Sequence, residues 1–196
     1  MVRLTEDEVK WLQSRYPNME YDMGKSVIAG LFHINHSYKG IAIKASFQIE
    51  VRLLSMHNRN QYPIVVNTDG KINCIAKLKN LPCEELHVYT NNSLCLGLPE
   101  RFSEYYPSGF ELELFFTHLI EHLYWVAYFE RYDKAPWEAE AHGDAAVAAY
   151  YIEKKDAVNL RKVYKRILGK GIALSKLSRY LNSQKQTRLL LKDLGL

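Results

Sequence analysis

The apolar residues of this chain change their spacing partway along the sequence. Between residues 26 and 54, β-forming and polar residues alternate on either side of Lys39-Gly40, which predicts an antiparallel hairpin with its turn at this dipeptide. Over residues 110–130, apolar residues recur at every third or fourth position instead, which predicts a long helix. Strands in one run and helices in another are typical of the α+β class, with helices on one side of an antiparallel sheet.

Shorter signals extend this order toward the N-terminus and along the sheet. Thr5 followed by Glu8 is a capping-box signature and predicts a first helix over residues 5–16. The apolar run 64–67 predicts a strand after the hairpin, and residues 71–77, which follow a turn, are predicted to form another. Together these strands predict an antiparallel meander that follows an N-terminal helix.

The segment before the long helix has no regular period. Residues 79–109 are rich in Pro, Gly and Asn, and loops of this size in a compact domain are usually functional or disordered. The stretch LHVYTNNSLCLGLP is too apolar to be disordered, so we expect an ordered functional loop. Beyond Pro136, apolar spacing predicts four helices, over residues 144–153, 156–168, 174–181 and 186–194.

Charge is distributed unevenly along the chain. Residues 151–196 contain 12 Lys and Arg against 3 Asp and Glu, whereas residues 1–150 contain 14 against 19. This division, +9 against −5, predicts a core over residues 1–143 and a basic helical extension over residues 144–196. The extension would steer an acidic protein partner or form a solvated face. It has no aromatic-interleaved motif, and we do not expect a nucleic-acid partner.

The chain has three cysteines, Cys74, Cys83 and Cys95. A disulfide framework needs more cysteines and an even number of them, so none is expected here. The first residues are charged, so no signal peptide is expected, and no stretch of about 18 apolar residues predicts a membrane span. We therefore expect a cytoplasmic protein with no membrane partner, whose thiols stay reduced.

A histidine pair in the predicted long helix raises the possibility of zinc chemistry. His118, Glu121 and His122 match the H-x-x-E-H pattern of inverted zinc peptidases, in which both His lie on one helix face. Such a site needs a third protein ligand, and the last 46 residues contain only Glu153, Asp156 and Asp193 as acids. We expect no metal and no cofactor, and keep the zinc peptidase as an alternative.

Two cysteines in the loop are candidate nucleophiles. Cys83 lies four residues before His87, but the acidic pair Glu84-Glu85 beside it disfavours a thiolate. Cys95 lies between two leucines, with no acidic residue between it and His87. A buried structural cysteine is the alternative for Cys95.

The residues around Cys95 resemble the ubiquitin-conjugating enzymes, and more closely their bacterial relatives in antiphage operons. The resemblance covers residues 28–142 and includes a strand meander that leads to Tyr62-Pro63. The bacterial relatives have His-x-Tyr, a turn and then Leu-Cys-Leu, with the His eight residues before the Cys. His87, Tyr89 and Cys95 match this spacing.

The resemblance also indicates roles for neighbouring residues. Eukaryotic members have an oxyanion-supporting Asn, from a His-Pro-Asn motif, eight residues before the Cys; here His87 occupies that position and the motif is absent. A neutral His87 N–H, or the side-chain amide of Asn91 or Asn92, would supply a donor to a tetrahedral oxyanion. His142, in the segment after Trp137, is similar to a His that follows the long helix in the bacterial group.

The family resemblance implies a fold and an activity. It implies an acyltransferase with a ubiquitin-conjugating-enzyme-like fold that carries an acyl group as a thioester on Cys95 and transfers it to an amine, in bacterial antiviral defence. The implied partners are an activating enzyme, a ubiquitin-like modifier or a cyclic-oligonucleotide synthase, and a target protein. The main alternative is an inert scaffold of the same fold that binds a ubiquitin-like protein.

Overall fold

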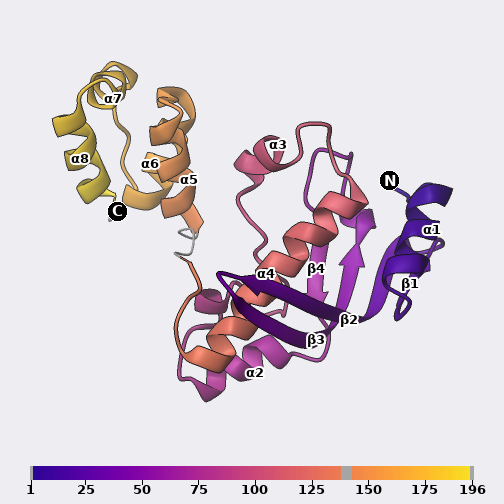
Figure 1. Ribbon diagram of the computed structural model, residues 1–196. Coiled ribbons are helices and arrows are strands. Elements are labelled where there is room, and N and C mark those ends of the chain that lie inside the picture. Colours follow the sequence, from indigo (N-terminus) through magenta and orange to yellow (C-terminus); the bar gives the residue numbers. More distant parts are fainter. Residues whose placement is uncertain (1, 138–142, 195–196) are drawn as a thin grey trace. The chain divides into compact units, whose positions relative to one another are not determined.

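The computed structural model describes residues 2–137 and 143–194 (Figure 1). These residues belong to two compact units, Met1–Glu138 and Ala139–Leu196. The first unit contains a four-stranded sheet with helices before and after it, and the second is entirely helical. The chain is therefore a mixed α+β protein with an antiparallel sheet and with N-terminal and C-terminal helices, as its apolar spacing predicts.

The sheet is an antiparallel meander in which every strand pairs with its neighbour in sequence. Its order is β1-β2-β3-β4, and the predicted hairpin is confirmed as β2 and β3, whose ladder runs from Val27 opposite Arg52 to Tyr38 opposite Ile41. The first strand was not predicted. The bounds are β1 (Met19–Asp22), β2 (Val27–Tyr38), β3 (Ile41–Arg52) and β4 (Ile64–Asn67).

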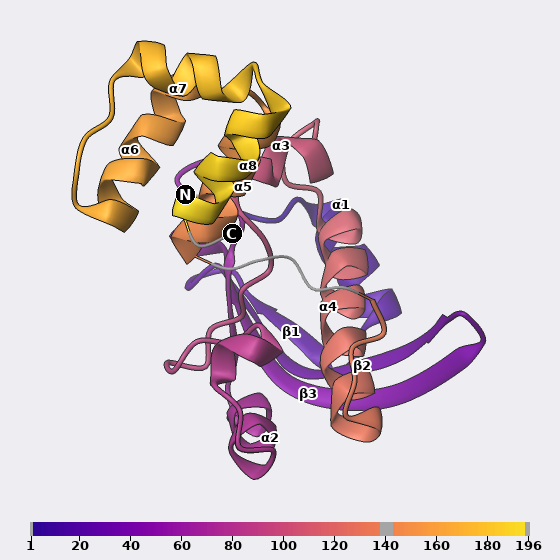
Figure 2. The same cartoon turned by 90° about the vertical axis from the view of Figure 1, so that its left-hand side faces the viewer.

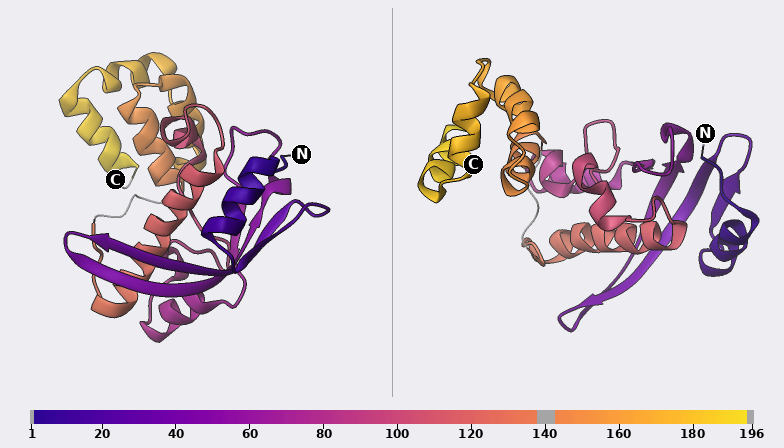
Figure 3. Two further views of the ribbon diagram at one scale, coloured as in Figure 1. Left: turned by 45° about the vertical axis from the view of Figure 1, so that its right-hand side comes forward. Right: turned by 90° about the horizontal axis from the view of Figure 1, so that it is seen from above.

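One face of the sheet is covered by the long helix α4 (Leu112–Tyr132), which lies across the curved β2–β3 ribbon (Figure 2, Figure 3). Residues two apart in a strand point to the same face, so the buried side chains alternate along β2 and β3. Phe32 meets Phe116 of α4 edge to face at 5.4 Å, and the Tyr124 hydroxyl donates to the Ile41 carbonyl at 2.9 Å. The predicted 110–130 helix is thus confirmed.

The N-terminal helix α1 (Glu6–Arg15) begins with the predicted capping box. The Thr5 hydroxyl accepts from the Glu8 N–H at 3.2 Å, and the Glu8 carboxylate accepts from the Thr5 N–H at 2.7 Å. Arg59 contacts both carboxylate oxygens of Glu8, at 2.9 and 3.0 Å, which ties the start of the helix to the loop before β4.

The segment predicted as a strand over residues 71–77 is instead the helix α2 (Lys71–Leu78), so that prediction is wrong. Its buried residues, Ile72, Ile75 and Ala76, are spaced three and four apart, and this spacing gives a helix an apolar face. The turn before the helix also stabilises its first turn, because Asn67 Oδ1 accepts a hydrogen bond from the Ile72 N–H at 3.0 Å.

The second unit contains the four predicted C-terminal helices. Asp156 caps the second of them by accepting from the Asn159 N–H at 3.0 Å, and Gly169 ends it in the left-handed conformation. Buried leucines, including Leu160, Leu177 and Leu190, form its interior. The bounds are α5 (Gly143–Glu153), α6 (Ala157–Leu168), α7 (Leu174–Leu181) and α8 (Gln184–Asp193).

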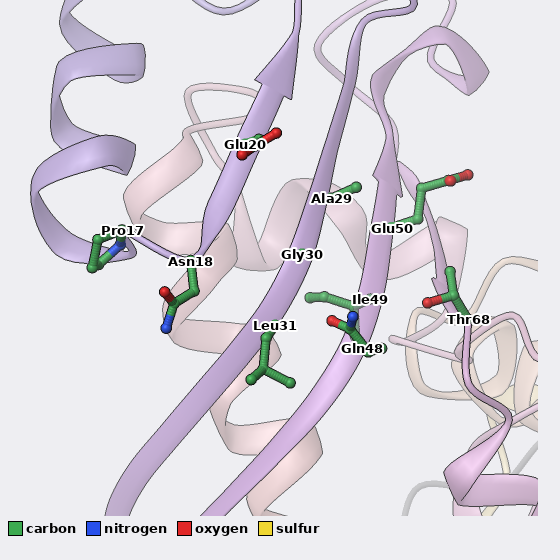
Figure 4. Close-up of a pocket in the computed structure, with 10 residues that line it drawn as sticks. All are labelled: Pro17, Asn18, Glu20, Ala29, Gly30, Leu31, Gln48, Ile49, Glu50 and Thr68. Atoms are coloured by element: carbon green, nitrogen blue, oxygen red, sulfur yellow. The ribbon is translucent and has the colours of Figure 1, made fainter.

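Across the described ranges 2–137 and 143–194, the helices are too short or too polar for any of them to cross a membrane. A shallow depression of about 700 Å³ is open on the sheet face opposite α4 (Figure 4). Its lining comes from β1, β2, β3 and the residues next to them, and it includes none of the predicted site residues. The lining residues are Pro17, Asn18, Glu20, Ala29, Gly30, Leu31, Gln48, Ile49, Glu50 and Thr68.

Candidate functional site

The loop that contains Cys95 begins as a short hairpin added to the edge of β4. Val88 bridges Leu94 across it, and Ser93 bridges Val66 of β4. The turn closes through the Asn92 N–H, which donates to the Tyr89 carbonyl at 2.9 Å. The segment predicted to be an ordered loop is therefore held by main-chain hydrogen bonds. It also contains the short helices η2 (Cys83–Leu86), η3 (Pro99–Arg101) and α3 (Phe102–Tyr105).

Cys95 leaves this hairpin with its main chain fixed and its side chain half-buried. Its N–H donates to the carbonyl of His87 at 2.8 Å, so the two candidate residues lie opposite each other. Leu94 and Leu96 on either side are buried in the core of the first unit. Because successive side chains of an extended segment point to opposite sides, the two buried leucines direct the thiol away from the core.

The thiol of Cys95 has a neighbour that was not among the predicted site residues. The Cys95 side chain, together with partial burial, raises the pKa of Tyr89 to about 12. Tyr89 pairs with Ser93 in the hairpin, and Cys95 lies two residues further on. Such diagonal positions share one face of a hairpin, so the register explains why the two residues are neighbours.

His87 is held by its main chain and by α4. It adopts a left-handed conformation, with φ of 56°, at the end of η2, where its N–H donates to the Glu84 carbonyl at 2.9 Å. Its ring stands edge-on to Trp125, with 4.9 Å between ring centroids, and lies 5.7 Å from the ring of His122. The long helix therefore fixes the imidazole that the sequence places eight residues before Cys95.

Asn91 and Asn92 build the turn of this hairpin. Asn91 Oδ1 accepts from the Ser93 N–H at 3.0 Å and from the Ser93 hydroxyl at 2.6 Å. Asn92 has a φ of 63°, and its Oδ1 accepts from the side-chain amide of Asn73 on α2. The Asn91 side-chain carbonyl is thus engaged within the turn and that of Asn92 by α2, and a donor role for either amide stays a prediction. His142 lies outside the described residues.

The chain after Cys95 is supported by Tyr62 of the Tyr-Pro pair. Gly97 has a φ of 151°, and a Cβ at this position would lie 3.2 Å from the Tyr62 hydroxyl oxygen. Tyr62 packs edge-on against the rings of Phe102 and Tyr106, which stack on each other, at 4.9 and 5.7 Å between centroids. A side chain at Gly97 would therefore meet a ring whose position is already fixed.

The two histidines of the predicted zinc motif have different neighbours. His118 Nδ1 is 2.8 Å from the Tyr106 hydroxyl, and the His118 ring stacks on Tyr105 at 5.5 Å. His122 is buried and faces His87. Among the residues that the structure describes, no three His, Cys, Asp or Glu side chains gather as a metal site.

The other two thiols lie in different settings. Cys83 Sγ is 3.3 Å from the Glu84 carboxylate, and partial burial together with this carboxylate raises the pKa of the Cys83 thiol. Its side chain therefore bonds to an acid and not to His87, as the neighbouring acids predict. Cys74 is exposed on α2.

Comparisons with protein-family models, with curated proteins and with solved structures give no match for this chain.

Proposed function

We propose that this chain is a conjugating enzyme that carries a ubiquitin-like protein, or the C-terminus of another protein, as a thioester on Cys95. It then transfers the acyl group to an amine of a target protein. The observation that carries the proposal is the setting of Cys95. Its thiol is half-buried, its N–H donates to the His87 carbonyl, and it follows a hairpin attached to the edge of the sheet.

The chemistry suits a thiol that has no strong base beside it. The incoming acyl group is already a thioester on the activating enzyme, so exchange onto Cys95 needs little further activation. Both the exchange and the later attack by an amine pass through tetrahedral oxyanions, and fixed donors near the sulfur lower those barriers. His87, which is held against α4 and bonded through its carbonyl to Cys95, is the first candidate for such a donor.

The order of elements supports the finer fold assignment. A first helix, a four-stranded meander, the cysteine hairpin and a long helix across the sheet follow one another as in the ubiquitin-conjugating enzymes. We propose this fold for the first unit, with the basic second unit as an extension that engages partners. The partners would be an activating enzyme, a ubiquitin-like modifier or a cyclic-oligonucleotide synthase, and a target, in cytoplasmic antiphage defence.

The proposal is tested by charging the purified protein. The chain is incubated with the activating enzyme and modifier encoded beside it, and the products are resolved with and without a thiol reductant. We expect one covalent adduct that the reductant removes, because a thioester exchanges with free thiols. An uncharged protein that still binds the modifier would show that the chain is the inert scaffold.

Replacing His87 by alanine is expected to slow the transfer of the acyl group to an amine. Loss of one oxyanion donor typically costs about 100- to 1000-fold in rate, and single-turnover discharge of the adduct to free lysine measures it. The matched control is His87→Asn, because Asn tolerates the left-handed backbone at this position and keeps an N–H donor. Discharge at the wild-type rate in His87→Ala would remove His87 from the mechanism.

A further inference from the structure

The second unit ends in two helices that follow each other almost without a break. α7 ends at Leu181 and α8 begins at Gln184, so only Asn182 and Ser183 lie between them. α8 leaves the end of α7 in a new direction (Figure 2). Two helices that meet in this way at a short turn form a helix-turn-helix, and DNA-binding proteins place the second helix of this motif in the major groove.

The turn between α7 and α8 is held by hydrogen bonds and by the core of the unit. The Ser183 N–H donates to the Tyr180 carbonyl at 3.2 Å, and the Thr187 N–H donates to the Ser183 carbonyl at 2.8 Å. The Thr187 hydroxyl donates to the Tyr180 carbonyl at 2.8 Å and so joins the first turn of α8 to the last turn of α7. Leu177 of α7 and Leu190 of α8 are fully buried. The direction of α8 relative to α7 is therefore fixed, as a helix that enters a groove requires.

The solvent face of α8 combines positive charge with one apolar side chain. Arg188 and Lys192 are exposed and four residues apart, so they lie on one face of the helix. Leu189 lies beside Arg188 and is 54% exposed. Neither cation forms an ion pair with another residue that the structure describes. Asp193, the acid of this helix, lies at its C-terminal end, away from the turn.

α7 presents further cations, and the whole segment is strongly basic. Lys176 and Arg179 are exposed and three residues apart, on one face of α7. Residues 154–193 contain 12 Lys and Arg against two acids. Double-stranded DNA carries one negative charge for about each 1.7 Å of its axis, and neutralisation of its phosphates supplies most of the affinity that does not depend on sequence. Charge complementarity therefore favours a polyphosphate as the ligand of this surface.

We propose that the second unit binds double-stranded DNA, with α8 in the major groove and α7 across the phosphate backbone. Arg188, Leu189 and Lys192 then face the base edges, where arginine suits guanine and an apolar side chain suits the thymine methyl group. Lys176 and Arg179 contact phosphates. The residue pattern alone does not predict this partner, because it has no aromatic-interleaved motif; the arrangement of α7 and α8 supplies the recognition element. The inference does not depend on the thioester chemistry of the first unit.

The test begins with the full chain and a fluorescently labelled duplex of mixed sequence, roughly 20 base pairs or two helical turns long. Anisotropy titrations compare this duplex with one of its single strands and with labelled poly-glutamate. We expect the duplex to bind most tightly, with an affinity that falls as salt rises, because phosphate contacts release counterions. Poly-glutamate bound as tightly as the duplex would identify an acidic protein as the partner, and equal binding of the single strand would exclude recognition of a groove. Either result overturns the inference.

Charge removal from α7 tests the predicted phosphate contacts. In Lys176→Gln/Arg179→Gln, the slope of log affinity against log salt should become shallower by about 2, since each cation neutralises one phosphate. Arg161→Gln/Lys165→Gln is the matched control, because both residues are exposed on α6 and the same charge is removed. An equal change of slope in the control would show that net charge alone drives binding, and it would overturn the helix-turn-helix assignment.

Arg188→Gln tests whether α8 contacts the bases. A pool of random-sequence duplexes is enriched for those that the wild-type protein binds, and both proteins are then titrated with the enriched duplex. We expect Arg188→Gln to bind it about 5- to 150-fold more weakly, which corresponds to the loss of one base contact. Circular dichroism should show an unchanged helix content, because Arg188 is exposed. An equal loss of affinity for the starting pool would leave only a phosphate contact, and α8 would not lie in the groove.

Discussion

Cys95→Ala is expected to abolish the covalent adduct entirely. The bond to the acyl group is made by Sγ itself, so no neighbouring side chain can replace it, in contrast to a donor whose loss only slows a step. Cys95→Ser is expected to retain the acyl group as an oxyester that resists thiol reductants, because the hydroxyl oxygen occupies the same position. Intact mass and non-reducing gels of the charged protein measure both outcomes.

The other two cysteines provide the controls for this experiment. Cys83→Ala and Cys74→Ala should keep the adduct. The Cys83 thiol bonds to the Glu84 carboxylate, which with partial burial raises its pKa, and Cys74 lies exposed on α2. An adduct that persists in Cys95→Ala, or one that disappears only in Cys83→Ala, would identify a different nucleophile.

Long periodic segments were predictable because many residues repeat the same signal. The hairpin of β2 and β3 spans two 12-residue strands, and its turn residues Lys39 and Gly40 both have positive φ, at 46° and 80°. A two-residue turn of this kind matches the twist of paired strands and fixes their register. The alternation of apolar and polar residues in the two strands then indicates which side chains are buried.

Short segments were harder to predict because they contain too few residues to show a helical or a strand spacing of apolar side chains. Residues 71–78 offer only three buried positions, and their helix is started by Asn67, which lies outside the segment. The strand β1 (Met19–Asp22) has one fully buried residue, Met19, among charged neighbours, so no alternation marks it. In both cases the local pattern is too short to decide between a helix and a strand, and hydrogen bonds to residues outside the segment help to fix the structure.

The sequence predicted which residues form the candidate site, but it did not predict the contacts between them. The spacing of His87 and Cys95 follows from the residues alone, whereas the position of Tyr89 on the same face as Cys95 depends on the register of a hairpin closed by Asn92. The turn residues were visible in the sequence. Their pairing was not, because a shift of one position would put Tyr89 on the opposite face of the hairpin from the thiol.

Gly30→Ala is expected to lower the stability of the first unit by about 2–6 kcal/mol. Gly30 has a φ of 149°, and a Cβ there would lie 2.0 Å from the main-chain oxygen of Asn18. That oxygen also accepts from the Leu31 N–H at 3.1 Å, and Met19 pairs with Gly30 in the sheet (Figure 4 labels Asn18, Gly30 and Leu31). An added methyl group can be accommodated only if β1 moves away from β2, which breaks this bond and exposes Met19.

Gly40→Ala is a control that introduces backbone strain without the steric clash expected in Gly30→Ala. Gly40 also has a positive φ, of 80°, but a Cβ there would have no atom within 4 Å, so this variant is strained without being crowded. A left-handed non-glycine residue costs about 1–2 kcal/mol, and for a chain of this length each kcal/mol lowers the melting temperature by about 2–4 °C. Thermal unfolding followed by circular dichroism should therefore place Gly30→Ala well below Gly40→Ala. Equal melting temperatures for the two variants would mean that β1 yields to the methyl group at no cost, and that the close approach of Asn18 to β2 does not hold the first strand in the sheet.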